Sequence, residues 1–458
     1  YFEQYYPDVC VEQETPEFSD TLRIGCFLIV QKLFRDLQIE DVLLSIFGDM
    51  GSFIEDIVSY MITNESCTFQ YYSNFMRNHP VMDKNIRDDT QISRLLKYNI
   101  KEEDINLFLR AWNQMNNTKE CIYVGYDSTN FNTNAYGIEL ADYGHPKVDE
   151  GLPQYNLAYA VNQKDSTPLF YELYDGSVID NTELEIMLEE AKEFGHERLG
   201  VLMDRGYISE KNIKALRSKG YEYILMMKQN QKICQEIIEE YGAAVQSLEG
   251  YYIGEHGVYG TTVKKQLYGQ ETNIHVYYDD IRASEEKIAL MSRYETWEKE
   301  IEKKVEKKLA TEGEMKKYRK VFKLKYDQNG YLVAYQRNSR YIKEEIRNLG
   351  FFFIITSEEM SASKALDIYR GRDNIEKMFR SLKSGIDFNK ARVHTTESLK
   401  SKVFVTLIAM IIRNELFQKA EVLRKKNRKA YTVPGMISEL ENIECTRNSV
   451  GKYRRKYA

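Results

Sequence analysis

The sequence predicts an α/β fold in which a mixed β-sheet is combined with several helical segments. Strand-type runs rich in Val, Ile, Tyr and Phe recur between residues 121 and 230, separated by amphipathic helical patterns. A last run, L-G-F-F-F-I-I-T-S at residues 349–357, is too apolar for anything but a central strand. Three strands, a helix and a strand–helix–strand unit favour a mixed sheet over a purely parallel one.

The first 118 residues are predicted to be mostly helical, because their apolar residues recur with 3.6-type spacing and strand alternation is never sustained. They carry 10 Lys+Arg against 19 Asp+Glu, a balance of −9. Such an acidic segment is unpromising as a nucleic-acid-binding module. The sequence starts at Tyr1 rather than Met and stops in a basic run, so we expect both ends to be truncated.

The α/β part is predicted to start at residue 119 and to continue to residue 230. Its first strand, in C-I-Y-V-G-Y-D-S-T-N-F, is expected to end at Asp127, and L-P-Q-Y-N-L-A-Y-A-V-N and T-P-L-F-Y-E-L-Y-D-G-S are two more strands. Residues 181–194 then form an amphipathic helix. The buried strand R-L-G-V-L-M-D ends at Asp204, and a helix at residues 209–219 and the strand Y-E-Y-I-L-M-M-K follow it.

Residues 231–349 interrupt this pattern and are predicted to form an insertion that is mostly β, with one long charged helix at residues 283–309. The apolar texture then returns, and V-F-V-T-L-I-A-M-I-I-R-N-E-L-F is a buried helix. A basic, helical C-terminal segment closes the chain. The predicted divisions are residues 1–118, 119–230, 231–349, 350–418 and 419–458.

The 458 residues have a formal net charge of −6, which is distributed unevenly. Residues 369–458 contain 21 Lys+Arg and 9 Asp+Glu, so they carry +12 and the preceding 368 residues carry −18. This asymmetry predicts that the C-terminal fifth contacts a polyanion. The longest apolar run, residues 403–412, is too short to span a bilayer. The six cysteines show no C-x-x-C pairing, which is typical of a protein from a reducing cytosol without a zinc site.

Residues 368–383, I-Y-R-G-R-D-N-I-E-K-M-F-R-S-L-K, are predicted to form one helix. At about 100° per residue, Tyr369, Arg372, Glu376 and Lys383 share one narrow arc beside an apolar arc that faces a core. Two interpretations are open. The arc is either a solvated face with i,i+4 charge pairs, which is the commoner case, or a site where Glu376 binds a metal ion while Arg372 and Lys383 bind phosphate.

Two further acids have one context in common, because Asp127 and Asp204 are each the first charged residue after an apolar strand. Singly, such an Asp is more often a turn or cap residue. Together with Glu376, they would make an oxygen-rich site for two Mg²⁺ or Mn²⁺ ions. Two ions about 3.5–4 Å apart can activate a water or a 3′-hydroxyl and stabilise the leaving oxygen of an in-line phosphoryl displacement.

Four motifs that occur in order along the chain carry a resemblance to a known family. The spacing Y-x₂-R-x₃-E-x₆-K at residues 369–383 resembles the signature of the DDE transposases of bacterial insertion sequences, in the cut-and-paste group with the Y-R-E-K motif. G-Y-D-S-T, Y-G-H-P-K-V-D-E-G-L-P-Q, D-R-G-Y, and F-R-S-L-K-S followed by A-R-V-H are similar to that group as well. The resemblance covers about residues 121–417.

The resemblance implies a ribonuclease-H-like catalytic domain that is interrupted by an insertion domain at residues 231–349. It also implies roles for single residues, in metal binding and in contacts to the DNA backbone near the cleaved end. The implied metal ligands are Asp127, Asp204 and Glu376, and the implied DNA-contact residues are Tyr369, Arg372 and Lys383, with Arg205 and Arg392 as further candidates for phosphate contact.

Two more residues each have two interpretations. His394 is either a phosphate contact or a structural hydrogen-bonding residue. Trp297 lies in the predicted insertion, where relatives use an aromatic residue to stack on a flipped base. Its acidic, helical neighbourhood, Y-E-T-W-E-K-E, favours helix packing instead.

The sequence therefore predicts a metal-dependent transposase that cuts the DNA ends of its element and joins them to target DNA. The expected partners are double-stranded DNA, as terminal inverted repeats and as target, and a second copy of the chain, with no membrane. The expected location is the bacterial cytoplasm, on the nucleoid when DNA is bound. An inactive or domesticated DNA-binding relative and a metal-dependent nuclease are the alternatives. A glycosidase with paired carboxylates is disfavoured, because a sugar substrate does not need the basic residues that lie next to Glu376.

Overall fold

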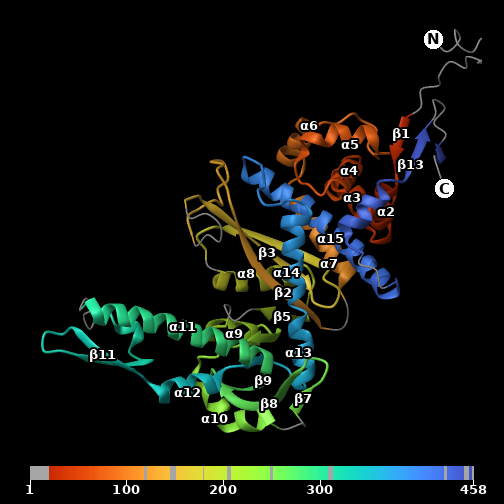
Figure 1. Ribbon diagram of the computed structural model, residues 1–458. Coiled ribbons are helices and arrows are strands. Elements are labelled where there is room, and N and C mark those ends of the chain that lie inside the picture. The colour runs from red at the N-terminus through yellow and green to blue at the C-terminus, as the bar shows by residue number, and fades with distance from the viewer. Residues whose placement is uncertain are drawn as a thin grey trace, which may run out of the picture. The chain divides into compact units, whose positions relative to one another are not determined.

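The computed structural model (Figure 1) divides the chain into two compact units, Tyr1–Gly200 with Gly371–Ala458, and Val201–Arg370. Both units contain helices and sheet, so the mixed α/β class predicted from the sequence is confirmed. Among the described helices, none is both long and apolar enough to cross a bilayer. The structure describes residues 20–117, 121–144, 151–178, 180–196, 198–203, 208–247, 251–307, 313–427, 431–447 and 453–455.

The first unit is mostly helical and carries two groups of strands. Its helices are α2 (Gly25–Asp36), α3 (Ile39–Phe47), α4 (Met50–Thr63), α5 (Tyr72–Asn78), α6 (Asp89–Arg94), α7 (Glu102–Asn116), α8 (Asp180–Glu193), α14 (Asp373–Arg380), α15 (Thr396–Asn427) and α16 (Val433–Leu440), with short helical turns η1 (Phe69–Tyr71), η2 (Leu95–Asn99) and η5 (Ser381–Gly385). Its strands are β1 (Asp20–Arg23), β2 (Ile122–Asn132), β3 (Gln154–Asn162), β4 (Pro168–Asp175), β13 (Glu444–Arg447) and β14 (Tyr453–Arg455).

Helix α15 forms the centre of the helical part of this unit. The apolar run that predicted a buried helix lies inside it, and its residues from Val403 to Ile412 are all buried. Helices α2, α4, α7 and α16 pack against it, together with η2 and β4. Phe404 contacts Phe47 on α3 at 6.0 Å and Phe108 on α7 at 5.1 Å between ring centroids. A helix that is apolar on all sides needs such complete coverage.

Helix α7 connects the N-terminal helices to the sheet through buried polar contacts. The indole N–H of Trp112 donates to the Pro168 carbonyl at 2.8 Å, and the Asn113 amide donates to the Leu169 carbonyl at 2.9 Å. His196 lies 2.7 Å from the Asn113 side-chain oxygen. Burial lowers the pKa of His196 to about 4, so this imidazole is neutral at pH 7.

Strands β4, β3 and β2 lie side by side in that order and are antiparallel. In the β2–β3 register, Asp127 is opposite Tyr159 and Phe131 is opposite Tyr155. The prediction that the first strand ends at Asp127 is therefore wrong, because β2 continues to Asn132. The polar residues after Asp127 remain in the strand and are buried, namely Ser128, Thr129 and Asn130.

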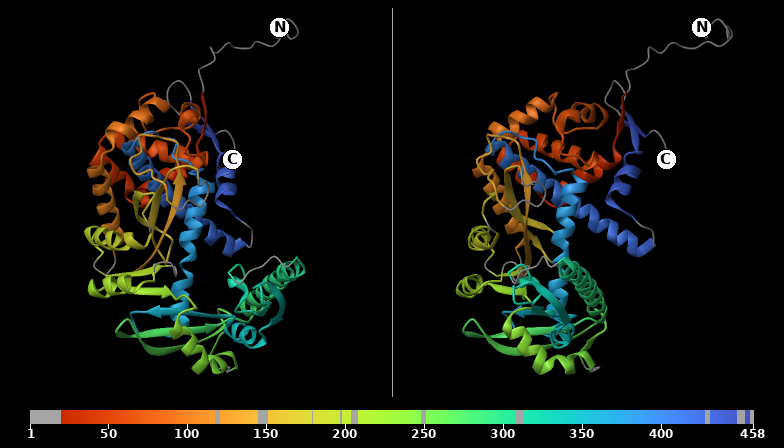
Figure 2. Two further views of the ribbon diagram at one scale, coloured as in Figure 1. Left: turned by 90° about the vertical axis from the view of Figure 1, so that its left-hand side faces the viewer. Right: turned by 60° about the vertical axis from the view of Figure 1, so that its left-hand side comes forward.

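The C-terminal segment is not only helical, as the sequence predicted, but also contains strand. After α16, strand β13 pairs antiparallel with both β1 and β14. The blue β13 and the red β1 lie next to each other in both views of Figure 2. These strands have three or four residues each, too few for an alternating pattern to reveal them.

The second unit contains the central strand predicted from L-G-F-F-F-I-I-T-S, which is β12 and is buried throughout. Its strands are ordered β6-β12-β9-β8-β7, and β5 contains the boundary with the first unit. The elements of this unit are β5 (Leu199–Met203), α9 (Glu210–Ser218), β6 (Glu222–Met226), α10 (Lys232–Ser247), β7 (Tyr252–Ile253), β8 (Val258–Leu267), β9 (Gln270–Tyr278), α11 (Asp280–Lys307), η4 (Lys316–Tyr318), β10 (Phe322–Tyr326), β11 (Leu332–Arg337), α12 (Ser339–Asn348), β12 (Phe351–Thr356) and α13 (Ala362–Arg370).

The content of residues 231–349 differs from the prediction of a mostly β segment with one long helix. Helices α10 and α12 were missed, and with α11 they contain more of the described residues than the strands do. In addition, β9 pairs with β12 from Tyr278 opposite Phe351 to Asn273 opposite Thr356. The first half of the predicted insertion therefore shares a sheet with β12.

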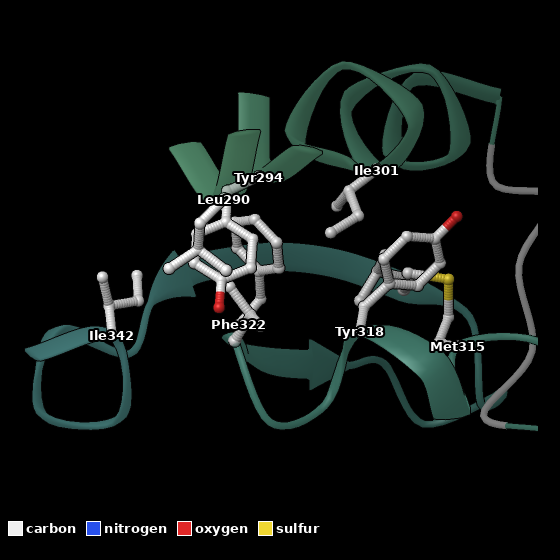
Figure 3. Close-up of a cluster of buried hydrophobic side chains, with 9 residues drawn as sticks. Leu290, Tyr294, Ile301, Met315, Tyr318, Phe322 and Ile342 are labelled. Carbon is white, nitrogen blue, oxygen red and sulfur yellow. The ribbon is translucent and has the colours of Figure 1, made fainter. Parts of the chain in front are cut away.

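The second half of that range forms a module with its own apolar core, consisting of α11, η4, β10, β11 and α12. Leu290, Tyr294 and Ile301 point from α11 toward Phe322 and the other side chains of the cluster (Figure 3). All of these residues are buried. Polar contacts reinforce the core, because Tyr318 and Arg337 donate hydrogen bonds to Glu300 and Glu298 on α11.

The ends of this module lie next to each other, which makes it removable. The Asp279 N–H donates to the Gly350 carbonyl at 3.0 Å. Replacing residues 281–348 by a short Gly/Ser bridge should leave the second unit folded, because closing a short loop costs little entropy. Circular dichroism and soluble yield would measure this. Removal of all residues 231–349 should fail, because it exposes the β12 edge; two deletions that behave alike would contradict the module boundaries.

Stability should fall with rising pH because of a buried acid on α4. The Glu55 side chain is 3% exposed, and one of its carboxylate oxygens has no hydrogen-bond partner among the described residues. Burial, and then the charges of Glu40 and Asp56, raise the pKa of Glu55 from 4.5 to about 8. Its protonated form is thus favoured by folding, so its contribution is complete below pH 4.5 and is lost as the pH rises through 8.

Between pH 5 and 8, one such group lowers the free energy of unfolding by about 1.4 kcal/mol per pH unit. Glu55→Gln should therefore raise the melting temperature at pH 8 and flatten its pH dependence. Glu439→Gln, at an exposed acid on α16, is the matched control and should leave the profile as it is. Parallel profiles for the wild type and Glu55→Gln would show that Glu55 is charged in the folded chain.

Candidate functional site

The predicted single helix over residues 368–383 is divided in the structure. Helix α13 ends at Arg370, Gly371 and Arg372 form a turn, and α14 begins at Asp373. A Cβ atom on Gly371 would lie 2.2 Å from the Gln163 side chain, so a larger residue would require that side chain to move. Glycine is also a weak helix former, which explains the break. The unit boundary follows Arg370, so Tyr369, which is buried, belongs to the second unit.

Arg372 and Glu376 are brought together at the start of α14. An Arg372 guanidinium N–H donates to Glu376 Oε1 at 2.8 Å. The Arg372 side chain is 15% exposed and the Glu376 side chain is 53% exposed. Such an i,i+4 pair is worth only about 0.3–0.5 kcal/mol, so its stability does not explain why an arginine is mostly buried here. The contact holds the carboxylate and the guanidinium on one side of the helix.

Lys383 follows α14 in the π-helical turn η5 and contacts the sheet. Its ammonium Nζ donates to Thr129 Oγ1 at 2.7 Å and lies 5.3 Å from the centre of the Phe131 ring. Thr129 and Phe131 are alternate residues of β2, so they lie on the same face of the sheet. Lys383 is thus placed on the sheet face beside α14.

Asp127 lies on this face as well. Every second residue of β2 lies on the same face of the sheet, and Asp127 is two residues from both Gly125 and Thr129. Helix α14 packs on β2, and a Cβ atom on Gly125 would lie 3.8 Å from Ile375 Cβ. Asp127 therefore lies between one residue that faces α14 and another that contacts Lys383. Its Oδ1 accepts a hydrogen bond from the Ser128 N–H at 2.9 Å, which fixes the carboxylate orientation.

The structure describes only some of the other predicted site residues. Asp204 and Arg205 lie outside the described residues, as does much of the predicted loop before β3. Arg392 has a left-handed backbone, with φ of 54°, and its guanidinium donates to Asp387 Oδ2 at 3.2 Å. The structure thus pairs Arg372 with Glu376 and Lys383 with β2, and it ties Arg392 to a carboxylate of its own loop.

Trp297 packs within the module core, as the sequence favoured. Its ring lies 5.9 Å from Tyr294 and 5.7 Å, edge-on, from Tyr318. The Arg293 guanidinium lies 5.4 Å from its centre. Partial burial among these side chains stabilises the helix–hairpin contact.

Sequence reasoning missed a basic surface on the same module, although its signal is visible. Residues 316–325, K-K-Y-R-K-V-F-K-L-K, contain six Lys or Arg among ten residues. All six cations are exposed, whereas the apolar residues between them enter the module core. The segment thus forms a cationic surface that extends from η4 into β10, which is the usual electrostatic footprint for a polyanion.

The described acids fit a hard divalent cation. Asp127 and Glu376 offer carboxylate oxygens, which Mg²⁺ and Mn²⁺ prefer, and neither soft thiolates nor imidazoles lie in this set. Glu376 is half-exposed and accessible to an ion and its waters. Among described residues, no group of three or more His, Cys, Asp and Glu could hold a metal ion. Asp204 lies outside the described residues.

Comparison with known proteins places these residues in a family. A family model described as "Transposase DDE domain" matches residues 124–412, more than half of the chain, and this range includes Asp127, Asp204 and Glu376. No curated protein matches the chain. A cryo-EM structure of the piggyBac transposase synaptic complex with hairpin DNA is similar at a TM-score of 0.39 and 8% identity, covering 86% of this chain and 70% of that chain. On the strength of the family match, the chain belongs to the transposase DDE domain family.

Proposed function

We propose that this chain is a DDE transposase of a bacterial insertion sequence, from the cut-and-paste group with the Y-R-E-K motif. It would cleave the ends of its element and transfer them to target DNA by in-line phosphoryl transfer. One observation carries the proposal: the helix with Glu376 packs on the β2 face that holds Asp127, and Lys383 bonds to that face. A ribonuclease-H-like core would present acids from a strand and a following helix in this way.

Asp127, Asp204 and Glu376 would hold two Mg²⁺ or Mn²⁺ ions. Bound ions of this kind activate a water or 3′-hydroxyl and stabilise the leaving oxygen. The chain's own contribution is orientation. The Ser128 N–H fixes the Asp127 carboxylate, and the Arg372 guanidinium holds Glu376.

The cations beside these acids would bind the DNA backbone. Arg372 and Lys383 are held by Glu376 and Thr129, so they are positioned before DNA arrives. An arginine can bind a phosphate through two parallel N–H groups, and a lysine acts as a point charge. Tyr369, Arg205 and Arg392 are proposed as further backbone contacts. The exposed cations at residues 316–325 would bind DNA away from the chemistry.

The proposed partners are duplex DNA, as terminal inverted repeats and target, and a second copy of the chain that would bridge the two ends. The proposed location is the bacterial cytoplasm. Because the C-terminal fifth carries +12, binding should be largely electrostatic and should weaken steeply with salt. An inactive DNA-binding relative would bind in this way but not cut, and a metal-dependent nuclease would cut without joining ends.

Glu376→Gln should abolish strand cleavage and leave DNA binding intact. The amide keeps the shape of the side chain and removes the charge that a divalent ion needs, so cleavage should fall by orders of magnitude. A plasmid-nicking assay with Mg²⁺ or Mn²⁺, beside a gel shift in EDTA, would measure both. Asp373→Asn, at an exposed acid on the same helix, is the control and should retain cleavage. Equal loss of cleavage and binding in Glu376→Gln would mean that Glu376 is structural.

Lys383→Ala should weaken DNA binding and reduce its salt dependence. Each lost phosphate contact lowers the slope of log K against log salt by about one unit. Thr129→Val removes the hydroxyl that accepts from Lys383 but keeps the cation, so it should retain the wild-type slope. Fluorescence anisotropy between about 50 and 200 mM salt would resolve the slopes. An unchanged slope in Lys383→Ala would assign Lys383 a purely structural role.

A further inference from the structure

The side of α14 away from Glu376 borders an open pocket of about 750 Å³ within the first unit. Asn374, Lys377 and Ser381 recur on α14–η5 at helical spacing and line it, whereas Arg372, Glu376 and Lys383 do not. The turn after β3 and the helices α15 and α16 complete its wall. The side of the helix that carries Arg372, Glu376 and Lys383 is therefore different from the side that lines this pocket.

The pocket is strongly cationic. Six basic residues line it against two acids, and the acids are already paired. Glu65 accepts from Arg413 at 2.5 Å, and Glu421 accepts from Arg424. The remaining four cations make no ion pair within the part of the chain that the structure describes, and they are Lys164, Lys377, Arg380 and Lys425.

Arg413, although paired with Glu65, keeps one donor without an acceptor among the described residues. This residue is 5% exposed, and its Nε donates to Ser381 Oγ at 3.1 Å. Its Nη1 is buried and has no hydrogen-bond partner among the described residues. Burying a charged donor without an acceptor is unfavourable, so such a group marks a place where an acceptor belongs.

The surrounding structure keeps this guanidinium in place. A Cβ atom on Gly385 would lie 2.7 Å from Arg413 Nε, so the glycine makes room for it. Arg424, which also lines the pocket, donates to the Tyr431 carbonyl at 2.7 Å, while its buried Nε has no partner in the described chain. Two arginines that line this pocket thus each have a buried N–H group without an acceptor among the described residues.

We infer that this pocket binds phosphate groups of a DNA backbone, in a segment separate from the one that is cut. Guanidinium groups pair with phosphate through parallel hydrogen bonds, and the volume suits more than a single small anion. A smaller recess of about 220 Å³ adjoins it, with Met378, Met410 and Val433 in its lining. An apolar floor beside a cationic rim suits the sugar and phosphate of a nucleotide.

This inference rests on the proposed function, because it takes DNA as the ligand. The test compares two double variants of the full chain with the wild type, by anisotropy on a labelled plain duplex in EDTA. Arg380→Ala/Lys425→Ala removes two exposed pocket cations. Lys419→Ala/Lys426→Ala removes two exposed cations of α15 that do not line the pocket, and it is the matched control.

The pocket variant should lose one to two units of the salt slope, since each phosphate contact contributes about 0.9. The control should keep the wild-type slope. The inference is overturned if the pocket variant retains its slope, or if both variants lose it equally, which would indicate a diffuse field. A wild type that binds no duplex overturns the proposed function itself, and this inference with it.

Two competition arms distinguish other anions. Inorganic phosphate or pyrophosphate that raises the wild-type melting temperature, but not that of the pocket variant, while both bind DNA alike would assign the pocket to free phosphate. Polyglutamate that binds the wild type more tightly than the pocket variant, with DNA affinity equal, would assign it to an acidic protein segment. Either result overturns the DNA assignment.

Discussion

The packing of α14–η5 against the β2 face is the contact on which the arrangement of the candidate site depends. Ile375 covers Gly125 near one end of this contact, and Lys383 reaches Thr129 near the other. Asp127 lies between them in sequence, so the acid on the strand and the acid on the helix are aligned by packing. A Cβ atom at position 125 would lie 3.8 Å from Ile375 Cβ, at ordinary van der Waals distance, so the helix and the strand are closely packed here. The chemistry and the core therefore share one set of contacts.

The start of α14 is held in place by contacts with the residue that follows β3. Gln163 follows β3, its own N–H donates to the Tyr123 carbonyl of β2 at 2.8 Å, and its carbonyl accepts from the Asn374 amide at 2.9 Å. The two strands thus fix where the helix begins and how it is rotated. This rotation sets which side carries Glu376 and which side carries the cations of the pocket. Because the helix is held at both ends, its two chemically different sides face fixed directions.

Much of the fold could be predicted because its strongest elements have strong patterns. The strands β3, β4, β5, β6 and β12 and the helix α15 are long apolar runs, and the predictions for them are confirmed. The break at Gly371 was missed although glycine is a weak helix former, and the close approach to Gln163, which is distant in sequence, has no local signal. The continuation of β2 past Asp127 depends on its pairing with β3, which local polarity does not reveal.

The candidate site could be predicted only in part. Helical spacing placed Arg372 beside Glu376, and the resemblance supplied their chemical roles. The contact between Lys383 and Thr129 joins segments far apart in sequence, and no local pattern announces it. The pocket was missed for the same reason, since each of its cations alone is an ordinary charge on a helix. Its meaning comes from the Nη1 of Arg413, which has no acceptor among the described residues and is recognised only once burial is known.

The pairing of β1 with β13 affects how a nascent chain acquires its structure. The second unit is complete once Arg370 has been made, but the first unit consists of segments on both sides of it. Strand β1 must wait for residues 444–447 before its edge is paired. Throughout most of synthesis on the ribosome, that edge stays open to other chains, and unpaired edges favour aggregation. Translation that terminates before Glu444 would release a chain whose first strand has no partner.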